Sequence, residues 1–467
     1  MNEIIYPTID LFLYDLRNGL GESQDEINRN RADFQKKLPK SVHPSLFQKD
    51  SYFEDEYVEL LTKPNFFETS DEPYPFQGYY YPVRLGDTYG LLLDCSVNNK
   101  TEPQPAECVK ELKTEIDRRL NNQTATIGQT WMISGWLPQS EAKPEDIAKA
   151  CYKELMPGSK WEQDIKGQGQ FLGATIFELS RYRLVMAEGP ASLKTIHNIQ
   201  ENQHVIIILY SDKATAEKSA RFYSDWMRLF HYRHKILWAY GQSRLLKQTI
   251  KNYFTAIEED RQSININQSQ EREFEKCRTT LLRVQDALNN YTIDLNRLEF
   301  QNRTIDINLS NYKKRLERIE EKAGNKLEFF EKFTNLVTDK YQLQITKDAE
   351  NLERGMKLLE NTISAVRSRV EVAKAERDRN FQDAIAILGV GWSVASFLPS
   401  PDKLGENAND PVRLFLAQSP LPPTWIKPAV PLVYKLSVAL VAAALAWLLI
   451  RVWPGLVKLI PLIAKKK

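Results

Sequence analysis

This sequence has little of what recognisable enzyme and metal sites need. It has only four cysteines in 467 residues, and none forms a C-x-x-C pair or other metal-binding spacing. It also has no phosphate-binding glycine loop, no nucleophile elbow and no zinc-protease helix motif. We therefore expect reduced, structural thiols, no catalytic residues, no cofactor and no bound metal.

The sequence also lacks a charge of one dominant sign. There are 63 basic and 61 acidic residues, which leaves a formal net charge of +2. Such a balance creates no strong field for nucleic acid, so direct nucleic-acid binding is not expected. The first residues, Met1 to Ile5, lack the basic start and apolar core of a signal peptide. Any membrane insertion should therefore come from the C-terminal end.

Proline is absent between Pro190 and Pro399. Interior proline costs a helix about 3 kcal/mol or more, so its absence permits very long helices. Before Pro190, short strand patterns alternate with helical ones. A Gly-Asp turn at residues 85–88 between two β-rich runs predicts a hairpin, and Pro82 indicates an edge strand for the first run. Residues 1–212 should thus form an α/β sandwich-like cytoplasmic domain that senses a signal or a partner.

Residues 213–262 predict a connecting helix that is rich in aromatic side chains. Their density indicates that this helix packs on the α/β domain. Four arginines on it are candidates for binding an anionic nucleotide signal, with a solvated face as the alternative: Arg221, Arg228, Arg233 and Arg244. His231 and His234 have a spacing that could hold a metal, but no carboxylate or cysteine nearby completes a site. A surface or domain-packing role is therefore favoured for both histidines.

Residues 268–383 carry the clearest pattern in the chain. Apolar residues recur at alternating spacings of three and four, which is typical of a coiled coil. The first run of this seam comprises Phe274, Cys277, Leu281, Val284, Leu288, Tyr291, Leu295, Leu298, Asn302, Ile305, Leu309, Tyr312, Leu316, Ile319 and Ala323. Asn302 is its strongly polar member and could fix the register. We predict an antiparallel hairpin that turns near Gly324, with one unbroken rod as the alternative.

Two apolar segments follow the stem, Ala384–Leu398 and Leu436–Ile450. We expect both to span the membrane, within a membrane region of residues 384–453. Trp453, at the end of this region, should anchor it at the membrane interface. A buried or interfacial helix is the alternative for Ala384–Leu398. Basic residues flank the pair on both outer sides, so both termini should be cytoplasmic. Residues 454–467 would then form a basic tail at the inner (cell) membrane.

The predicted fold class is therefore α+β. It combines an N-terminal α/β sandwich-like cytoplasmic domain, a long α-helical coiled-coil stem and a C-terminal two-helix transmembrane hairpin. In its last two hundred residues this plan resembles that of the CorA-like two-transmembrane proteins. The family's Gly-Met-Asn signature is missing, and the outside loop offers Gly405-Glu406-Asn407 instead. The resemblance implies a pore mouth at Glu406 and Asp410. Divergent relatives without the signature act as membrane effectors in prokaryotic antiviral systems.

A second resemblance rests on two short stretches, residues 8–16 (TIDLFLYDL) and residues 230–240 (FHYRHKILWAY). They are similar to prokaryotic conflict-system proteins of the type associated with caspase-like proteases and TPR-repeat proteins. This similarity implies a defence role.

Three hypotheses follow for function. The first is a membrane-anchored homo-oligomeric effector of a defence system, in which a protein partner or small nucleotide signal acts through the stem to permeabilise the membrane. The second is a CorA-like divalent-cation channel or transporter. The third is a membrane-tethered coiled-coil scaffold.

Overall fold

The computed structural model describes most of the chain up to the end of the stem. The described residues are 2–19, 21–43, 45–47, 56–70, 74–138, 143–184, 200–263 and 271–374, with Val430, Val433 and Val441. Contacts divide the chain into two units. One comprises Met1–Ile257 with Asp286–Lys357, and the other comprises Glu258–Gln285 with Leu358–Lys467.

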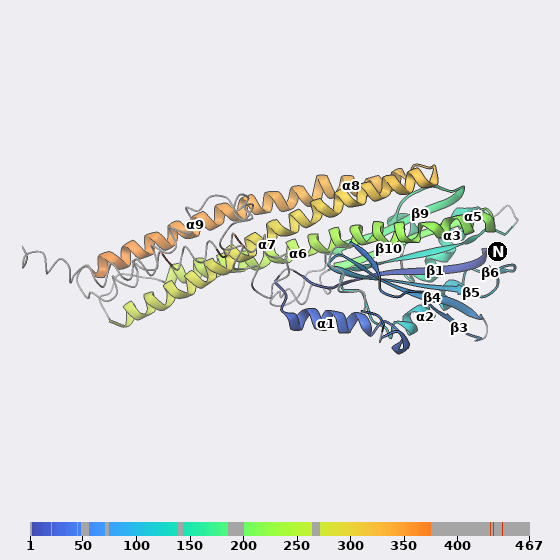
Figure 1. The fold of residues 1–467 in the computed structure, drawn as a ribbon. Coiled ribbons are helices and arrows are strands. Elements are labelled where there is room, and N and C mark those ends of the chain that lie inside the picture. Colours follow the sequence, from blue (N-terminus) through green and yellow to red (C-terminus); the bar gives the residue numbers. More distant parts are fainter. Residues whose placement is uncertain are drawn as a thin grey trace, which may run out of the picture. The chain divides into compact units, whose positions relative to one another are not determined.

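A ten-stranded mixed sheet forms the centre of the first unit (Figure 1). Its main path runs β2-β4-β5-β1-β7-β10-β9-β8, while β3 pairs with β4 and β6 pairs with β1. The strands are β1 (Glu3–Leu16), β2 (Tyr57–Glu59), β3 (Asn65–Glu68), β4 (Phe76–Leu85), β5 (Thr88–Val97), β6 (Pro103–Pro105), β7 (Gly128–Trp136), β8 (Ile165–Phe171), β9 (Ala174–Leu184) and β10 (Gln200–Tyr210). All neighbours are antiparallel except β7 and β10, which are parallel.

The predicted hairpin is the β4–β5 pair. Its turn contains Gly86 at φ +58°, a backbone conformation that favours glycine. The prediction of an edge strand from Pro82 is wrong, because β4 pairs with β5 on one side and with β2 and β3 on the other. Pro82 is tolerated because β2 pairs with residues 83–85 and β3 with residues 77–80. The proline therefore lies in the gap between the two short partners.

One face of the sheet packs against α1 (Gln24–Gln35), α2 (Cys108–Arg119) and α3 (Pro144–Leu155). Successive side chains of a strand point to opposite faces, so Leu11 and Leu13 of β1 join this core. Short helical segments complete the domain: η1 (Lys40–Val42), α4 (Trp161–Asp164), α5 (Lys213–Ser219) and η3 (Ala220–Phe222).

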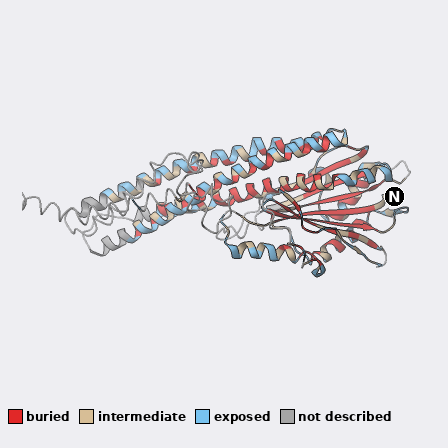
Figure 2. Ribbon diagram, in the orientation of Figure 1, coloured by how far each residue is buried: buried red, intermediate tan, exposed pale blue. Residues whose placement is uncertain are grey.

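The opposite face of the sheet is covered by α6 (Tyr223–Ser263), the predicted aromatic helix. Phe12 of β1 meets Phe230 of α6 edge-on at 5.3 Å between ring centroids, and the Tyr14 hydroxyl donates to the Met227 carbonyl at 2.8 Å. Most of the first half of α6 is buried (Figure 2). The prediction that this helix packs on the α/β domain is confirmed.

The stem forms a helical hairpin from α7 (Glu271–Ala323), α8 (Glu328–Leu336), a π-helical turn η4 (Val337–Gln342) and α9 (Leu343–Lys374). The chain reverses at Gly324, which has φ +71°. The predicted turn is therefore present. Within the first unit the buried apolar residues of α7 follow the predicted seam from Leu288 on: Leu288, Tyr291, Leu295, Leu298, Ile305, Leu309, Tyr312, Leu316 and Ile319.

The predicted fold class is wrong in its transmembrane hairpin. Across the part of the chain that the structure describes, no helix is both long enough and apolar enough to cross a membrane. The physical reason lies in the pattern of the long helices, which bury one apolar seam and expose charged faces. The uncharged runs were also only fifteen residues each, about 22 Å of helix against a hydrocarbon core of about 30 Å. Ala384, Leu398, Leu436, Ile450 and Trp453 lie outside the described residues.

Candidate functional site

The face of the sheet beneath α6 carries buried polar side chains in strands that are otherwise apolar. Asp10, Thr130 and His204 are fully buried, and Glu178 is 2% exposed. Burying a polar group is costly unless it is hydrogen-bonded, and burying a charge costs more. Polar groups that a core retains in this way are the first candidates for a functional site. They form two clusters, which we call the acid pair and the histidine chain.

The acid pair consists of Asp10 on β1 and Asp94 on β5. The two residues lie directly opposite each other in the antiparallel ladder. Because two buried carboxyls this close together do not both ionise readily, the pair retains a proton near neutral pH. The Tyr223 hydroxyl, from the first residue of α6, donates to Asp10 Oδ2 at 2.9 Å. Burial raises the pKa of both carboxyls, and for Asp94 the neighbouring Asp10 charge raises it further.

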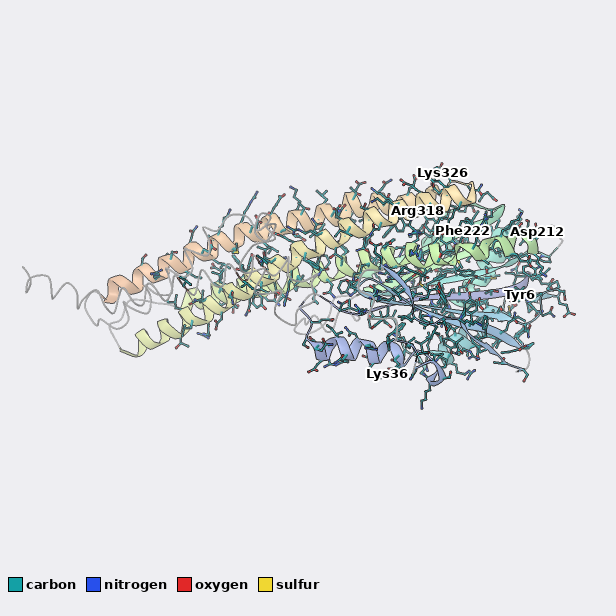
Figure 3. All side chains as sticks on the ribbon, in the orientation of Figure 1. Tyr6, Lys36, Asp212, Phe222, Arg318 and Lys326 are labelled. Atoms are coloured by element: carbon teal, nitrogen blue, oxygen red, sulfur yellow. The ribbon has the colours of Figure 1, made fainter. Side chains whose placement is uncertain are left out.

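A partly exposed tyrosine lies along the same strand as the acid pair. Tyr6 has φ +51°, which is uncommon for a residue with a side chain, beside a register shift in β1. Its hydroxyl accepts from Gln77 Nε2 at 2.7 Å and from Ser96 Oγ at 3.1 Å. Burial raises the pKa of Tyr6. Figure 3 labels Tyr6 within the sheet. The irregular backbone therefore places a phenol in the polar patch that contains the acid pair.

The histidine chain joins three strands to α6. Glu178 Oε1 lies 3.2 Å from His204 Nε2, and His204 Nδ1 lies 2.8 Å from Thr130 Oγ1. The same hydroxyl oxygen lies 2.8 Å from His234 Nε2 on α6, and His234 Nδ1 lies 2.9 Å from Asn202 Nδ2. These contacts give four consecutive hydrogen bonds.

Burial shifts the titration of every ionisable member of the histidine chain. It lowers the pKa of His204 and of His234 well below the usual value, and the nearby Arg233 charge lowers both further. Burial also raises the pKa of Glu178 to about 7, although the charge of Arg233 opposes that rise. Both imidazoles are therefore neutral near pH 7, whereas Glu178 titrates there.

Gly128 is required where β7 passes under His234. A Cβ atom at this position would lie 2.5 Å from His234 Nδ1 and 2.8 Å from its Cγ. We expect Gly128→Ala to lower the free energy of unfolding by about 1–3 kcal/mol, the usual effect of overpacking. Urea denaturation would measure it. In a His234→Ala background the same substitution should cost much less, and an equal cost in both backgrounds would contradict this contact.

On its other side α6 contacts the hairpin through ion pairs whose carboxylates are buried. Asp225 accepts from Arg315 Nη1 at 2.8 Å and from Lys322 Nζ at 2.6 Å, both on α7. Further along α6, Arg244 and Lys247 both donate to Asp348 of α9. These pairs hold α6 to both helices of the hairpin.

The four predicted ligand-binding arginines do not converge. Arg221 is exposed with its guanidinium 5.3 Å from the Phe222 ring, which is labelled in Figure 3, and Arg228 lies 4.1 Å over the Tyr57 ring. Arg233 is buried and donates to Ser180 Oγ at 2.7 Å. Since Arg244 pairs with Asp348, the four side chains have separate surroundings. They do not line one anion site in the described structure.

The remaining predicted positions are the two histidines of α6 and the two acidic residues of the predicted pore mouth. His231 and His234 of α6 are both buried, and burial lowers the pKa of His231 to about 3. Among the residues that the structure describes, no three His, Cys, Asp or Glu side chains gather as a metal site would require. Glu406 and Asp410, the predicted pore mouth, lie outside the described residues.

Local patterns in the sequence do not predict either buried cluster. Their members come from positions 10, 94, 130, 178, 202, 204 and 234, and among these only 202 and 204 are near each other in the sequence. The feature of the sequence that indicates such buried polar residues is a polar residue inside an apolar run, such as Asp10 in IDLFLYDL or Asp94 in YGLLLDCSV.

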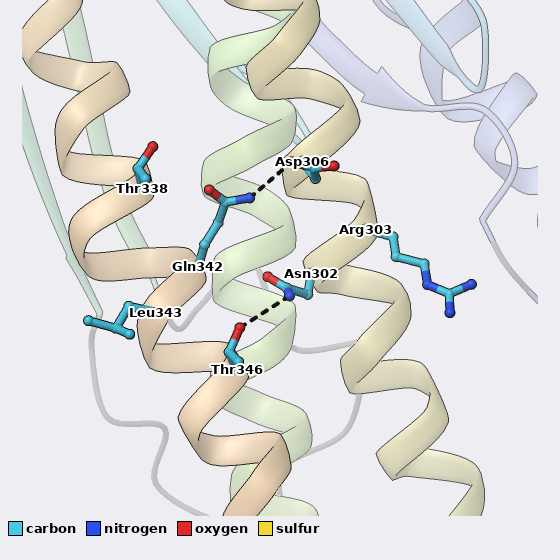
Figure 4. Close-up of a pocket in the computed structure, with 7 residues that line it drawn as sticks. All are labelled: Asn302, Arg303, Asp306, Thr338, Gln342, Leu343 and Thr346. Atoms are coloured by element: carbon cyan, nitrogen blue, oxygen red, sulfur yellow. Dashed lines mark hydrogen bonds between the residues drawn. The ribbon is translucent and has the colours of Figure 1, made fainter.

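A shallow groove also lies in the hairpin, between α7 and the π-helical turn (Figure 4). Its volume is about 410 Å³, and it is lined by Asn302, Arg303, Asp306, Thr338, Gln342, Leu343 and Thr346. Asn302 Nδ2 donates to Thr346 Oγ1 at 3.4 Å. The polar seam residue predicted from the heptads thus faces the second helix of the hairpin.

No protein-family model, curated protein or solved structure matches this chain. The resemblances to CorA-like and conflict-system proteins therefore stay predictions. The class that the geometry defines is a mixed-sheet domain whose covering helix is also part of a helical bundle.

Proposed function

We propose that this protein is a non-enzymatic coupling protein, in which the sheet domain receives a signal or a partner and α6 transmits the change to the α7–α9 hairpin. The observation that carries this proposal is that α6 is held on two opposite sides by hydrogen bonds and ion pairs to the buried carboxyls of Asp10 and Asp348 and through its own buried Asp225. Packed interfaces change between discrete arrangements, and specific polar partners determine which arrangement is stable.

The sheet side of α6 supports the proposal through its titratable contacts. Tyr223 donates to Asp10, and Lys235 Nζ donates to Asp87 Oδ2 at 2.7 Å in the β4–β5 turn. A ligand or partner that altered either contact would change the free energy of holding α6 on the sheet. Differential contacts of this kind are what a two-state coupling element needs.

The contacts between α6 and the α7–α9 hairpin would carry the change away from the sheet. Tyr240 of α6 stacks on Tyr341 of the π-helical turn, with ring centroids 4.1 Å apart. The Arg244–Asp348 contact lies twenty-one residues beyond Tyr223, about 31 Å along a straight helix. A displacement of α6 would therefore change contacts at a distance from the sheet's polar clusters.

The experiment is hydrogen exchange on the full chain carrying Tyr223→Phe, which removes the donor to Asp10. Loss of a hydrogen bond to a carboxyl costs about 1.5 kcal/mol, so roughly tenfold faster exchange is expected for backbone amides at the affected contacts. Coupling predicts that faster exchange extends to residues 343–357 of α9.

The matched control is Tyr152→Phe. Tyr152 of α3 donates to Asp164 Oδ2 at 2.8 Å on the opposite face of the sheet, so the chemical change is the same. Exchange in residues 343–357 should stay at the wild-type rate in this variant. If Tyr223→Phe affects only the sheet and the start of α6, the coupling proposal fails and the domain is a passive support for the hairpin.

A further inference from the structure

The histidine chain has a direction that elementary hydrogen-bond chemistry determines. An ionised Glu178 can only accept, so His204 must carry its proton on Nε2 and leave Nδ1 as an acceptor. Thr130 must then donate to His204 and accept from Nε2–H of His234. This leaves His234 Nδ1 free to accept from Asn202, which agrees with the amide orientation in the structure.

We propose that protonation of Glu178 reverses this chain and moves the proton of His234 from Nε2 to Nδ1. The proton balance is complete. His204 passes its Nε2 proton to Glu178, Thr130 passes its proton to His204 Nδ1, and His234 passes its Nε2 proton to Thr130. One proton from water ends on His234 Nδ1, and the Asn202 amide turns so that its oxygen accepts.

Asn202 provides a reason for the reversal. Its Oδ1 atom is buried and receives no hydrogen bond from the residues that the structure describes. The reversed chain gives this oxygen a donor. Asn202 is only partly buried as a residue, whereas the other four members are buried, so it is also the end of the chain nearest to solvent.

Ionisable groups on the elements packed around Glu178 influence how readily this carboxyl loses its proton. Arg233 Nε on α6 lies 3.8 Å from Glu178 Oε1, and Lys166 of β8 and Lys332 of α8 also favour the ionised carboxyl. Tyr312 of α7 also faces this carboxyl and is buried. Burial opposes all of these cations and brings the pKa of Glu178 to about 7.

At the α6 end of the chain, burial and the charge of Arg233 disfavour the protonated form of His234. A neutral imidazole that exchanges one tautomer for the other avoids this cost, whereas a doubly protonated ring does not. The protonation state of a carboxyl on β9 is thereby transmitted to α6 without a buried imidazolium. The consequence for signalling rests on the proposed function, but the reversal is measured independently of it.

The test is nitrogen NMR of the full chain with ¹⁵N-labelled histidine, which reports the ring nitrogen that carries the proton. As pH falls through about 7, the value to which burial raises the Glu178 pKa, His204 and His234 should both change from Nε2–H to Nδ1–H. Thr130→Ser keeps the hydroxyl and should behave like the wild type. Thr130→Val removes it and should uncouple the two histidines.

Glu178→Gln supplies a second variant, because its amide can donate to His204 as the protonated acid does. It should hold both histidines as Nδ1–H at every pH. The proposal is overturned if both rings of the wild type keep Nε2–H while Glu178 titrates, or if Thr130→Val retains the coordinated change. The two proposals can fail separately. If the histidine tautomers reverse with pH but hydrogen exchange in α9 is unchanged by Tyr223→Phe, the reversal of the histidine chain is established and the coupling function is refuted.

Discussion

Replacing Asp225 with alanine should lower the free energy of unfolding by about 3–5 kcal/mol, the usual cost of removing one partner from a buried ion pair. Asp225 is 2% exposed and receives hydrogen bonds from Arg315 and Lys322 of α7. The Arg315 side chain is only 12% exposed, so without Asp225 its charge stays buried and unpaired. Lys322 is 53% exposed and can turn to solvent, so most of the cost comes from Arg315.

Urea denaturation of the full chain measures this loss, and Asp33→Ala is the control. Asp33 forms an exposed pair with Lys36 on α1, with 46% of its side chain accessible, and such pairs contribute about 0–1 kcal/mol. The double variant Asp225→Leu with Arg315→Met should recover most of the stability, since apolar replacements of buried pairs are often neutral. A loss below about 1 kcal/mol for Asp225→Ala would show that α6 is not anchored to α7 through this pair.

Local signals in the sequence predict local structure well here. The β4–β5 hairpin follows from two β-rich runs around Gly86, and the hairpin of the stem follows from a heptad pattern that stops at Gly324. Both features depend on residues within a few positions of each other. The buried seam of α7 was predicted for the same reason, because a helix brings residues three and four apart onto one face.

The pairing of strands that are distant in the sequence cannot be predicted from such local signals. Nothing local indicates that β7 pairs with β10 in parallel, yet this pairing brings Thr130 close to His204. The β9–β10 pairing then places Glu178 beside His204. The candidate site exists only after several strands that are distant in sequence have paired. A polar residue in an apolar strand pattern shows only that a buried polar group needs a partner.

The transmembrane prediction failed for a related reason. Apolarity and continuity with the stem favour a membrane span, but each uncharged run is shorter than the hydrocarbon core requires. In the described part of the chain, the apolar seam of α7 is buried within the fold. An apolar run alone therefore does not distinguish a membrane span from a segment that packs in another way.

Replacing Asp10 with asparagine should stabilise the protein by about 2–4 kcal/mol at pH 8, with the gain disappearing toward pH 4. Burial raises the pKa of Asp10 above its value in the unfolded chain. The folded state therefore binds more protons than the unfolded state between these two pKa values, and the stability of the wild type falls as pH rises through that window. Asparagine stays neutral, and its amide can donate to Asp94 in place of the shared proton.

Urea denaturation at a series of pH values tests this, with Asp348→Asn as a control of opposite sign. Burial alone would raise the pKa of Asp348, but Lys247 and Arg244 hold it below its usual range. The Asp348 carboxylate therefore contributes stability above its unfolded pKa that is lost as pH falls through its folded pKa. Asp348→Asn should be destabilised at neutral pH, and the difference from wild type should shrink in acid. If Asp10→Asn is instead less stable than wild type at pH 8, a negative charge on the acid pair stabilises the fold. That charge is then balanced by a cation or a hydrogen-bond donor rather than by a shared proton.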